Sequence, residues 1–183
     1  YTHEHADQTS GIFELRPFFW LNKKKIDVYG SKKTIKELKK KYDYCFQPRQ
    51  GYMPIAKDHT IKNNFFLKKG NKKIKINSFE VQHGLIKATA YIVNKIAYLS
   101  DCSHIPKESK KYLENLDFLI IDCLRYKYHP GHFNLETAIL LSEELKPKKT
   151  ILTNLHVELD YEKLKKKLPP HILPAFDGMN FNF

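Results

Sequence analysis

The sequence predicts a single domain of mixed α/β class that spans residues 1–183. Its length of 183 residues is near the usual size of one domain. Hydrophobic residues make up 42% of the chain and charged residues 28%, which is typical of a globular protein and argues against a disordered or membrane-spanning chain. Segments with strand patterns predominate early and alternate with helical segments later, with no linker or repeat between them.

A strand followed by a helix is expected near the start of the chain. Residues 26–29 (IDVY) are a short run of β-formers that ends at Gly30, and Ser31 is placed to cap a helix over residues 34–42. Residues 43–70 contain several Gly and Pro breakers, which predicts a less regular region, and residues 51–54 (GYMP) are expected to be a loop that enters a strand.

The middle of the chain is expected to be sheet. Apolar and polar side chains alternate over residues 73–82, which predicts a strand. Two further runs, at 88–93 and 96–100, flank Asn94-Lys95, and this dipeptide is a signal for a two-residue hairpin turn.

Helices and strands alternate in the second half of the chain. Helical periodicity and end signals predict helices over residues 105–115, 135–145 and 161–167. Short apolar runs predict strands over residues 118–121, 150–153, 172–176 and 179–183.

The net charge of the chain indicates which kinds of partner it can bind. Thirty-two basic and 20 acidic residues give a net charge of +12, which favours anionic partners such as phosphates, nucleic acid or acidic lipid without selecting among them. Runs of lysine also fit solvated helix faces and turns.

Three cysteines without CxxC spacing predict buried thiols in a reducing, cytoplasmic compartment. The chain begins with Tyr1 and not Met, so we expect an N-terminal portion to be missing.

The densest chemical signal lies at the start of the chain. His3, His5 and Asp7 are spaced by two residues, and on an extended segment or tight loop this spacing sends side chains the same way, so they can converge on one metal ion. The alternative is an exposed histidine-rich terminus of the kind that purification leaves.

Further candidate ligands follow the expected strands of the middle and second half. His83, Asp101 and His156 each come where a strand ends, a place where sheet scaffolds present catalytic groups. Taken singly, a residue of this kind more often has a structural or surface role. Together with the N-terminal cluster they make a candidate set of four histidines and two aspartates.

Several segments resemble one family of hydrolases. The matching segments are THEHADQTSGI at 2–12, VQHG at 81–84, YLSD at 98–101, DCLRYKYHPGHFNLETA at 122–138, ILTNLH at 151–156 and AFDGM at 175–179. They resemble the metallo-β-lactamase superfamily, in which HxHxD is the signature, and its branch related to phosphoribosyl cyclic phosphate phosphodiesterases. The resemblance implies an αββα sandwich, of which the N-terminal part of the first sheet is expected to be missing.

The resemblance also implies a site for two divalent metal ions. It places His3, His5 and His83 around one ion, Asp7 on the other with a catalytic role, and Asp101 between the two. The mixed histidine and aspartate set, which lacks thiolates, suits Zn²⁺ or Mn²⁺ at an open catalytic site.

Two family ligands of the second metal ion differ in this chain. Gln8 and Asn154 stand where the family commonly has histidines, and an amide is a weaker ligand than a neutral imidazole. His156 is the candidate replacement for the second of them. We therefore expect a second metal site that is weak, selective for manganese or empty.

A turn between an expected strand and helix carries the candidate acid. The resemblance implies that His132 protonates the leaving oxygen, for which an ordinary imidazole pKa is well suited. His129 is a candidate substrate contact, and both histidines also fit a role as turn or cap residues. Arg125 fits a phosphate clamp because its planar fork can grip two oxygens, and it fits an ion pair with Asp122 equally well.

These residues predict a metal-dependent phosphodiesterase that hydrolyses a small cyclic phosphate or a nucleotide-like phosphodiester by metal-activated hydroxide. An RNA-processing nuclease of the same superfamily and a non-catalytic, metal-dependent binding protein are the alternatives. The expected partner is a small phosphorylated substrate, with nucleic acid less favoured, no membrane, and a homodimer left open.

Overall fold

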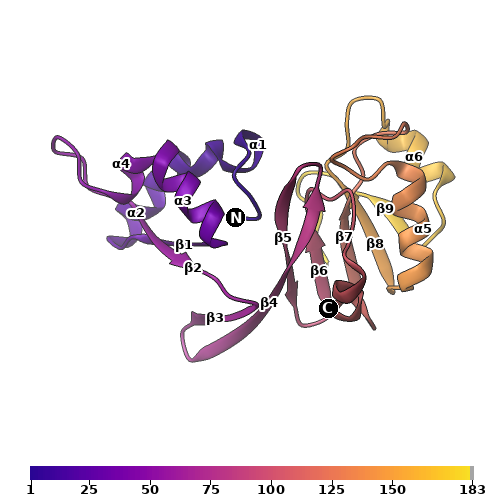
Figure 1. The fold of residues 1–183 in the computed structure, drawn as a ribbon, viewed down its shortest axis with the longest axis horizontal. Helices are drawn as coiled ribbons and strands as arrows, with labels where there is room; N and C mark the ends of the chain where they lie inside the picture. Colours follow the sequence, from indigo (N-terminus) through magenta and orange to yellow (C-terminus); the bar gives the residue numbers. More distant parts are fainter. Residues whose placement is uncertain (182–183) are drawn as a thin grey trace. The chain divides into compact units, whose positions relative to one another are not determined.

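The computed structural model describes residues 1–181, and the chain divides into two compact units, Tyr1–Asn63 and Asn64–Phe183 (Figure 1). Each unit has its own sheet and its own hydrophobic core. The mixed α/β class predicted from the sequence is confirmed in both.

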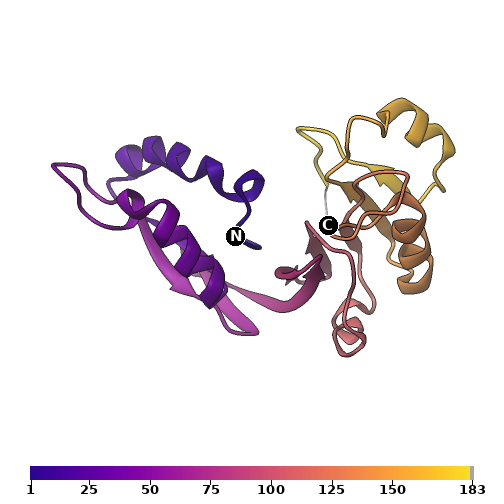
Figure 2. The ribbon, with the colours of Figure 1, turned by 45° about the horizontal axis from the view of Figure 1, so that its top comes forward.

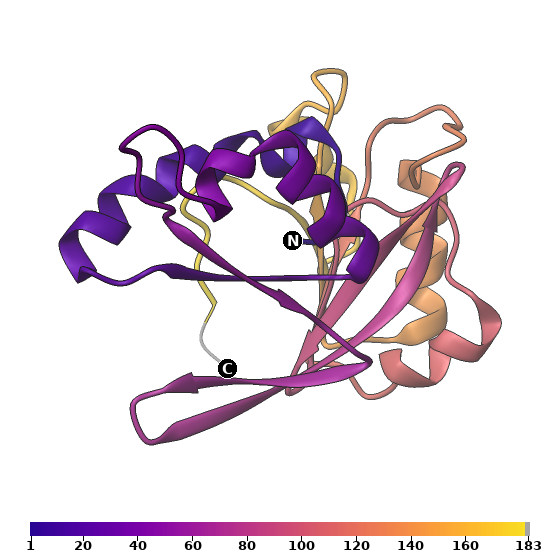
Figure 3. The same ribbon diagram turned by 60° about the vertical axis from the view of Figure 1, so that its left-hand side comes forward.

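The first unit is a small layer of helices on a two-stranded parallel sheet. Strand β1 (Ile26–Gly30) pairs with β2 (Ala56–Thr60), and the helices lie together on one side of them (Figure 3). The helices are α1 (Ala6–Thr9), the 3-10 helix η1 (Ser10–Leu15), α2 (Arg16–Asn22), α3 (Lys32–Lys41) and α4 (Asp43–Phe46). Ile12, Val28 and Leu38 are among the buried side chains that join the two layers.

Helix α3 forms as the sequence predicts. The Ser31 hydroxyl accepts a hydrogen bond from the Thr34 N–H at 3.2 Å, which satisfies one of the unpaired donors of the first turn. Ile35 and Leu38 then face the core while the lysines face solvent. Ahead of β1, α1, η1 and α2 follow one another as a nearly continuous helical segment (Figure 2), to which the sequence analysis assigned no element.

Residues 43–70 are more regular than predicted. They contain α4, β2 and β3 (Asn64–Lys69). Strand β2 reads AKDHT and lacks an apolar alternation, because it is held by pairing with β1 and buries one face only in part. The turn residues at 51–54 indicated a strand here, and side-chain alternation did not give its bounds.

Among the described residues, the second unit contains a seven-stranded sheet in the order β3-β4-β5-β6-β7-β8-β9. The pairings from β3 to β6 are antiparallel and those from β6 to β9 are parallel. The remaining strands are β4 (Lys72–His83), β5 (Ile86–Val93), β6 (Ile96–Leu99), β7 (Phe118–Asp122), β8 (Lys149–Thr153) and β9 (Ile172–Pro174). The predicted hairpin between β5 and β6 is confirmed, with Asn94 at a φ of 54°.

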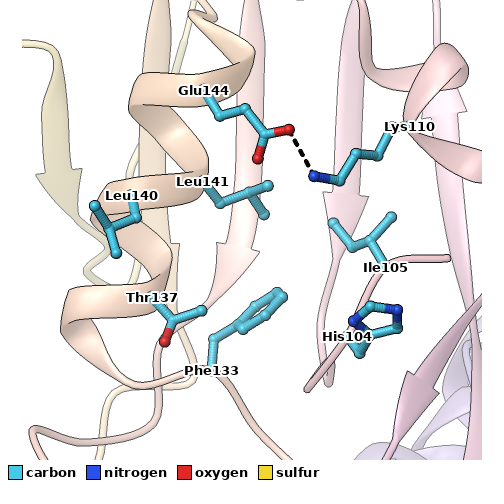
Figure 4. A pocket seen from close by; sticks show the side chains of 8 residues that line it. All are labelled: His104, Ile105, Lys110, Phe133, Thr137, Leu140, Leu141 and Glu144. Carbon is cyan, nitrogen blue, oxygen red and sulfur yellow. Dashed lines mark hydrogen bonds and ion pairs between the residues drawn. The ribbon is translucent and has the colours of Figure 1, made fainter. Parts of the chain in front are cut away.

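The helices of the second unit agree with the prediction except at one place. Helices α5 (Leu135–Leu145) and α6 (Tyr161–Lys167) have the predicted bounds. The expected helix at 105–115 is a 3-10 helix, η2 (Lys107–Leu113). It lies beside α5 across a pocket of about 220 Å³, and Lys110 pairs with Glu144 at 2.6 Å at its edge (Figure 4).

The predicted terminal strand at 179–183 is wrong over its described part. The Met179 N–H donates to the Phe176 carbonyl at 3.1 Å, so the chain turns there and has no strand partner at 179–181. Residues 182–183 lie outside the described residues. Among the helices of the described chain, none combines the length and the apolar character needed to span a membrane.

Candidate metal site

The order of the strands in the second unit brings the candidate residues of that unit to one edge of the sheet. Because β4 is antiparallel to β5 and β5 is antiparallel to β6, strands β4, β6, β7 and β8 all run in the same direction. Their carboxyl ends therefore meet. His83 ends β4, Asp101 follows β6, Asp122 ends β7 and Asn154 follows β8.

Three side chains at this edge converge to within metal-binding range. Ligand atoms of His83, Asp101 and His132 all lie within 4.8 Å of one another. His132 comes from the segment between β7 and α5, and its ring contacts that of His83 with 4.6 Å between centroids. The sequence singled out all three residues, and the structure shows that they form one cluster.

His83 is oriented by a backbone carbonyl. Its Nδ1 lies 2.6 Å from the Gly131 oxygen, so Nδ1 carries the proton and donates it, while Nε2 lies 3.7 Å from Asp101 Oδ2. The side chain is 6% exposed. A Cβ at position 131 would lie 3.3 Å from the His83 ring, so glycine allows this close approach. Donation of the second ring N–H to a carbonyl is the usual arrangement of a metal-ligand histidine.

Asp122 is the group that the sequence analysis did not place in the site. Its carboxylate is fully buried and accepts hydrogen bonds from the Cys102 N–H at 3.0 Å, from Asn154 Nδ2 at 3.1 Å and from His132 Nδ1 at 2.8 Å. The sequence did carry a signal for Asp122, because this residue lies at the end of a buried strand, much as Asp101 follows β6.

The loop before His132 is closed by its own side chains. Arg125 donates to the carbonyls of Tyr128 at 2.7 Å and Lys127 at 3.3 Å. The Gly131 N–H donates to His129 Nδ1 at 3.1 Å, so His129 carries its proton on Nε2. Burial lowers the pKa of His129, and the nearby charges of His132 and Arg125 lower it further. His129 is therefore a neutral donor, and its role toward substrate stays a prediction, as does that of Arg125.

The first unit holds the candidate ligands of the N-terminal motif. The rings of His3 and His5 meet edge to face with 4.6 Å between centroids, and Thr2 Oγ1 lies 3.1 Å from His3 Nδ1. Asp7 is exposed, and its carboxylate accepts a hydrogen bond from Gln8 Nε2 at 3.3 Å. Gln8 thus holds a neighbouring carboxylate at the position where the family commonly has a histidine.

Two lysines of α3 hold the segment that carries these histidines. Lys33 Nζ forms an ion pair with Glu4 Oε1 at 2.6 Å, and Lys41 Nζ donates to the Glu4 carbonyl at 2.6 Å. Thr9 Oγ1 donates to the His5 carbonyl at 2.8 Å. The N-terminal motif is therefore tied to its own unit through Glu4 and His5.

The structure leaves two of the predicted features open. His156 is exposed, donates its N–H to the Leu124 carbonyl, and is not a member of the clusters found among the described residues. Convergence of His3, His5 and His83 on one ion joins the two units and stays a prediction. The three cysteines, Cys45, Cys102 and Cys123, are buried as predicted, and burial raises the pKa of Cys123 to about 12.

The residues present fit a divalent metal ion. A histidine oriented through Nδ1 and a buried carboxylate 3.7 Å from its Nε2 are donors of the kind that Zn²⁺ or Mn²⁺ takes in proteins. Histidine and carboxylate without thiolate are typical of a catalytic site rather than a structural one.

Comparison with known proteins identifies similar chains. A family model described as a beta-lactamase superfamily domain matches residues 1–154. The crystal structure of a new diphosphatase from the PhnP family is 31% identical with a TM-score of 0.88, and the match covers 100% of this chain and 70% of that one. Zn²⁺-bound PqqB from Methylobacterium extorquens is 14% identical with a TM-score of 0.71, over 100% of this chain and 71% of that one.

Two further matches are informative about length and fold. The short form of human tRNase Z is 19% identical with a TM-score of 0.64, over 97% of this chain and 75% of that one. The octanoyltransferase of Porphyromonas gingivalis (strain ATCC BAA-308 / W83) is 28% identical over 97% of this chain. This chain spans 36% of that curated relative. The matches confirm the metallo-β-lactamase fold predicted from the sequence.

Proposed function

Since the chain belongs to the metallo-β-lactamase superfamily and to its PhnP-like branch, we propose that it is a metal-dependent hydrolase that cleaves a small cyclic phosphate or a nucleotide-like phosphodiester. The observation that carries the proposal is the cluster of His83, Asp101 and His132 at the carboxyl edge of the sheet. This cluster combines metal ligands with a histidine whose second nitrogen is held by a buried carboxylate.

The donor set supports Zn²⁺ or Mn²⁺ as the metal. Divalent ions, when bound, lower the pKa of water and neutralise charge on a phosphoryl group. We propose that His3, His5, His83 and Asp101 hold one ion. The second ion would rest on Asp7 and Asp101, with His156 as the further candidate ligand. Gln8 and Asn154 are amides with other partners in the structure, which supports a weak second site.

The residues around the cluster supply the remaining tasks. His132 protonates the leaving oxygen in our proposal, because its Nδ1 is engaged by Asp122 and its Nε2 is the nitrogen that can serve substrate. His129, neutral and protonated on Nε2, can donate to a phosphoryl oxygen. Two N–H groups of Arg125 donate to loop carbonyls. In our proposal its positive charge and its remaining N–H donors attract the phosphate of the substrate.

A diphosphate substrate is the second candidate. The 31% identical neighbour is described as a diphosphatase, and the same acid and metal ligands suit cleavage of a phosphoanhydride. The net charge of +12 is compatible with either anionic substrate. The likeness to tRNase Z is one of fold, and the nuclease alternative has weaker support.

The test is turnover by the full chain after metal removal and reloading with Zn²⁺ or Mn²⁺. The panel contains bis(p-nitrophenyl) phosphate, a 2′,3′-cyclic nucleotide, a five-membered cyclic ribose phosphate, a dinucleotide diphosphate and a short RNA. We expect metal-dependent cleavage of a cyclic or diester substrate and its loss in Asp101→Asn. Preference for the dinucleotide diphosphate would select the second candidate. Metal binding without turnover of the whole panel would contradict both and favour the non-catalytic alternative.

A further inference from the structure

The buried carboxylate beside His132 has no assigned task in the proposed function. Asp122 lies at the end of β7 with no exposed surface, and it is 2.8 Å from His132 Nδ1. Its other bonds come from the Cys102 backbone N–H and from the Asn154 amide, so three donors surround it. These three donors satisfy the oxygens of a carboxylate that has no access to water.

Asn154 holds the other oxygen of Asp122. Its backbone φ is 62°, a left-handed conformation that asparagine tolerates better than most residues. Its Nδ2 donates to Asp122 Oδ1 at 3.1 Å and lies 3.4 Å from His132 Nδ1. The amide therefore fixes the oxygen of Asp122 that His132 does not use.

The backbone around His132 is fixed from the opposite side. Phe133 is buried in the core cluster of the second unit and points into the pocket between α5 and the 104–110 segment (Figure 4). The Leu124 N–H donates to the Phe133 carbonyl at 2.9 Å. A ring anchored on one side of an extended segment leaves the neighbouring side chain on the other side, toward Asp122.

We propose that Asp122 and Asn154 act as positioning residues, which hold His132 with its proton on Nδ1 and present Nε2 to the leaving oxygen. The inference rests on the proposed hydrolase function. In the reaction, a water-derived oxygen forms a new bond to phosphorus as the P–O bond to the leaving group breaks. The electron pair of the broken bond stays on the leaving oxygen, which takes the proton from Nε2 of the imidazolium. His132 is then neutral and still protonated on Nδ1. The negative charge of Asp122 stabilises the imidazolium before transfer.

The first experiment reads the tautomer directly and needs no turnover. The zinc-loaded full chain is labelled with ¹⁵N-histidine, and long-range ¹H–¹⁵N spectra are recorded at alkaline pH, with His132 assigned from the signals lost in His132→Gln. We expect the neutral Nδ1–H tautomer for His132. A neutral Nε2–H tautomer in the wild-type chain would overturn the inference, whether or not a substrate is cleaved.

The second experiment reads the consequence for the leaving group. Asp122→Asn replaces an acceptor oxygen by an amide that can donate to Nδ1, so we expect the tautomer to switch. The rate with an alkoxide leaving group should fall about 10²- to 10⁴-fold, the usual size of acid catalysis. The rate with bis(p-nitrophenyl) phosphate should fall much less, because p-nitrophenolate needs little protonation. The metal content should be retained.

Two further variants keep the test decisive. Asn154→Gly keeps the left-handed backbone and removes the amide, and we expect a smaller loss in the same direction. Asp117→Asn is the matched control at the other end of β7, where Asp117 pairs with Lys148, and it should leave turnover unchanged. Equal losses on both leaving groups, or loss of metal in Asp122→Asn, would overturn the positioning role. No turnover by the wild type, together with the Nδ1–H tautomer, would count against the proposed function and leave the geometry standing.

Discussion

The two units hold their candidate ligands by different means. In the second unit, His83 and His132 are each fixed through Nδ1 by a buried acceptor, the Gly131 carbonyl and the Asp122 carboxylate. In the first unit, the segment with His3 and His5 is held largely through its backbone and through the side chain of Glu4. Lysines of α3, which reach across from solvent, supply much of that support.

This difference predicts how each half responds to change. Hydrogen bonds to buried groups are costly to lose, since a buried partner is left unsatisfied. Ion pairs with an exposed lysine contribute little and are screened by salt. We therefore expect substitutions near the strand ends to lower turnover or metal affinity strongly. Substitutions around Glu4 should change the stability of the protein modestly and in a salt-dependent way.

The largest effect is expected for His132→Ala. If His132 protonates the leaving oxygen, the rate with an alkoxide leaving group falls about 10²- to 10⁴-fold. The loss is much smaller with a p-nitrophenolate leaving group, and the metal content does not change. Steady-state rates on both substrates, with metal analysis of the same samples, check this. A lower metal content would show that His132 is a ligand, and no loss on either substrate would return it to a turn residue.

The next effect concerns the glycine beside His83. In Gly131→Ala the new Cβ meets the ring at 3.3 Å and must displace it, because the ring is also held by the Gly131 carbonyl. Groups that orient a ligand histidine are typically worth about 10- to 100-fold in metal affinity. Competition with a chelator measures the change. Gly11→Ala is the control, since a Cβ there has nothing within 4 Å, and equal affinities of the two variants would contradict the close fit.

Replacement of the amides tests the weak second site. Gln8→His is expected to raise the affinity for a second Zn²⁺ or Mn²⁺, because imidazole is a better ligand than an amide. Asn154→His removes the donor to Asp122 and should add less than Gln8→His, although the family commonly has histidine at both positions. Calorimetric titration of the metal-free chain gives the stoichiometry. An unchanged stoichiometry in the double variant Gln8→His and Asn154→His would contradict our interpretation of both departures.

The fold was predictable for those helices and strands that show a clear pattern of apolar and polar side chains. Helices α5 and α6 and the strands β4 to β8 follow from periodicity and from turn signals. Strand β2 was indicated only as a strand after the loop at 51–54 and without bounds, because pairing with β1 holds its polar sequence in place. The helical segment at residues 6–22 was missed, because its largest apolar side chains do not form one stripe, and Trp20 and Leu21 are exposed.

The sequence predicted which residues form the candidate site better than it predicted the hydrogen bonds between them. His83, Asp101 and His132 were found from strand ends and from a family resemblance, and they do form a cluster. The bonds of Asp122 were not predictable, because they depend on groups that are 10 to 32 residues away in the chain. The sequence left open an ion pair between Arg125 and Asp122, whereas the structure pairs Asp122 with His132, and Arg125 donates to loop carbonyls.

The smallest effect is expected in the first unit, for Glu4→Gln. Burial raises the pKa of Glu4, but the hydrogen bond and charge of Lys33 outweigh it, so the pKa lies below its ordinary value. A carboxyl group whose pKa is lower in the folded state stabilises the protein above its unfolded pKa, and this contribution is lost as the pH falls through the folded value. The side chain of Glu4 is 13% exposed and that of Lys33 58%, so we expect at most about 1 kcal/mol at neutral pH.

Denaturant unfolding of the metal-free chain at several pH values measures this contribution. The wild type should be more stable than Glu4→Gln at pH 7, and the difference should shrink once the pH falls below the ordinary range for glutamate, because the wild-type carboxyl group is then protonated too. High salt should reduce the difference at pH 7 as well. Glu80→Gln is the matched control, since its pair with Lys87 is exposed on both sides and lies in the second unit. A difference that is constant from pH 7 to pH 3 would mean that Glu4 acts through packing and that the contrast between the two units is not electrostatic.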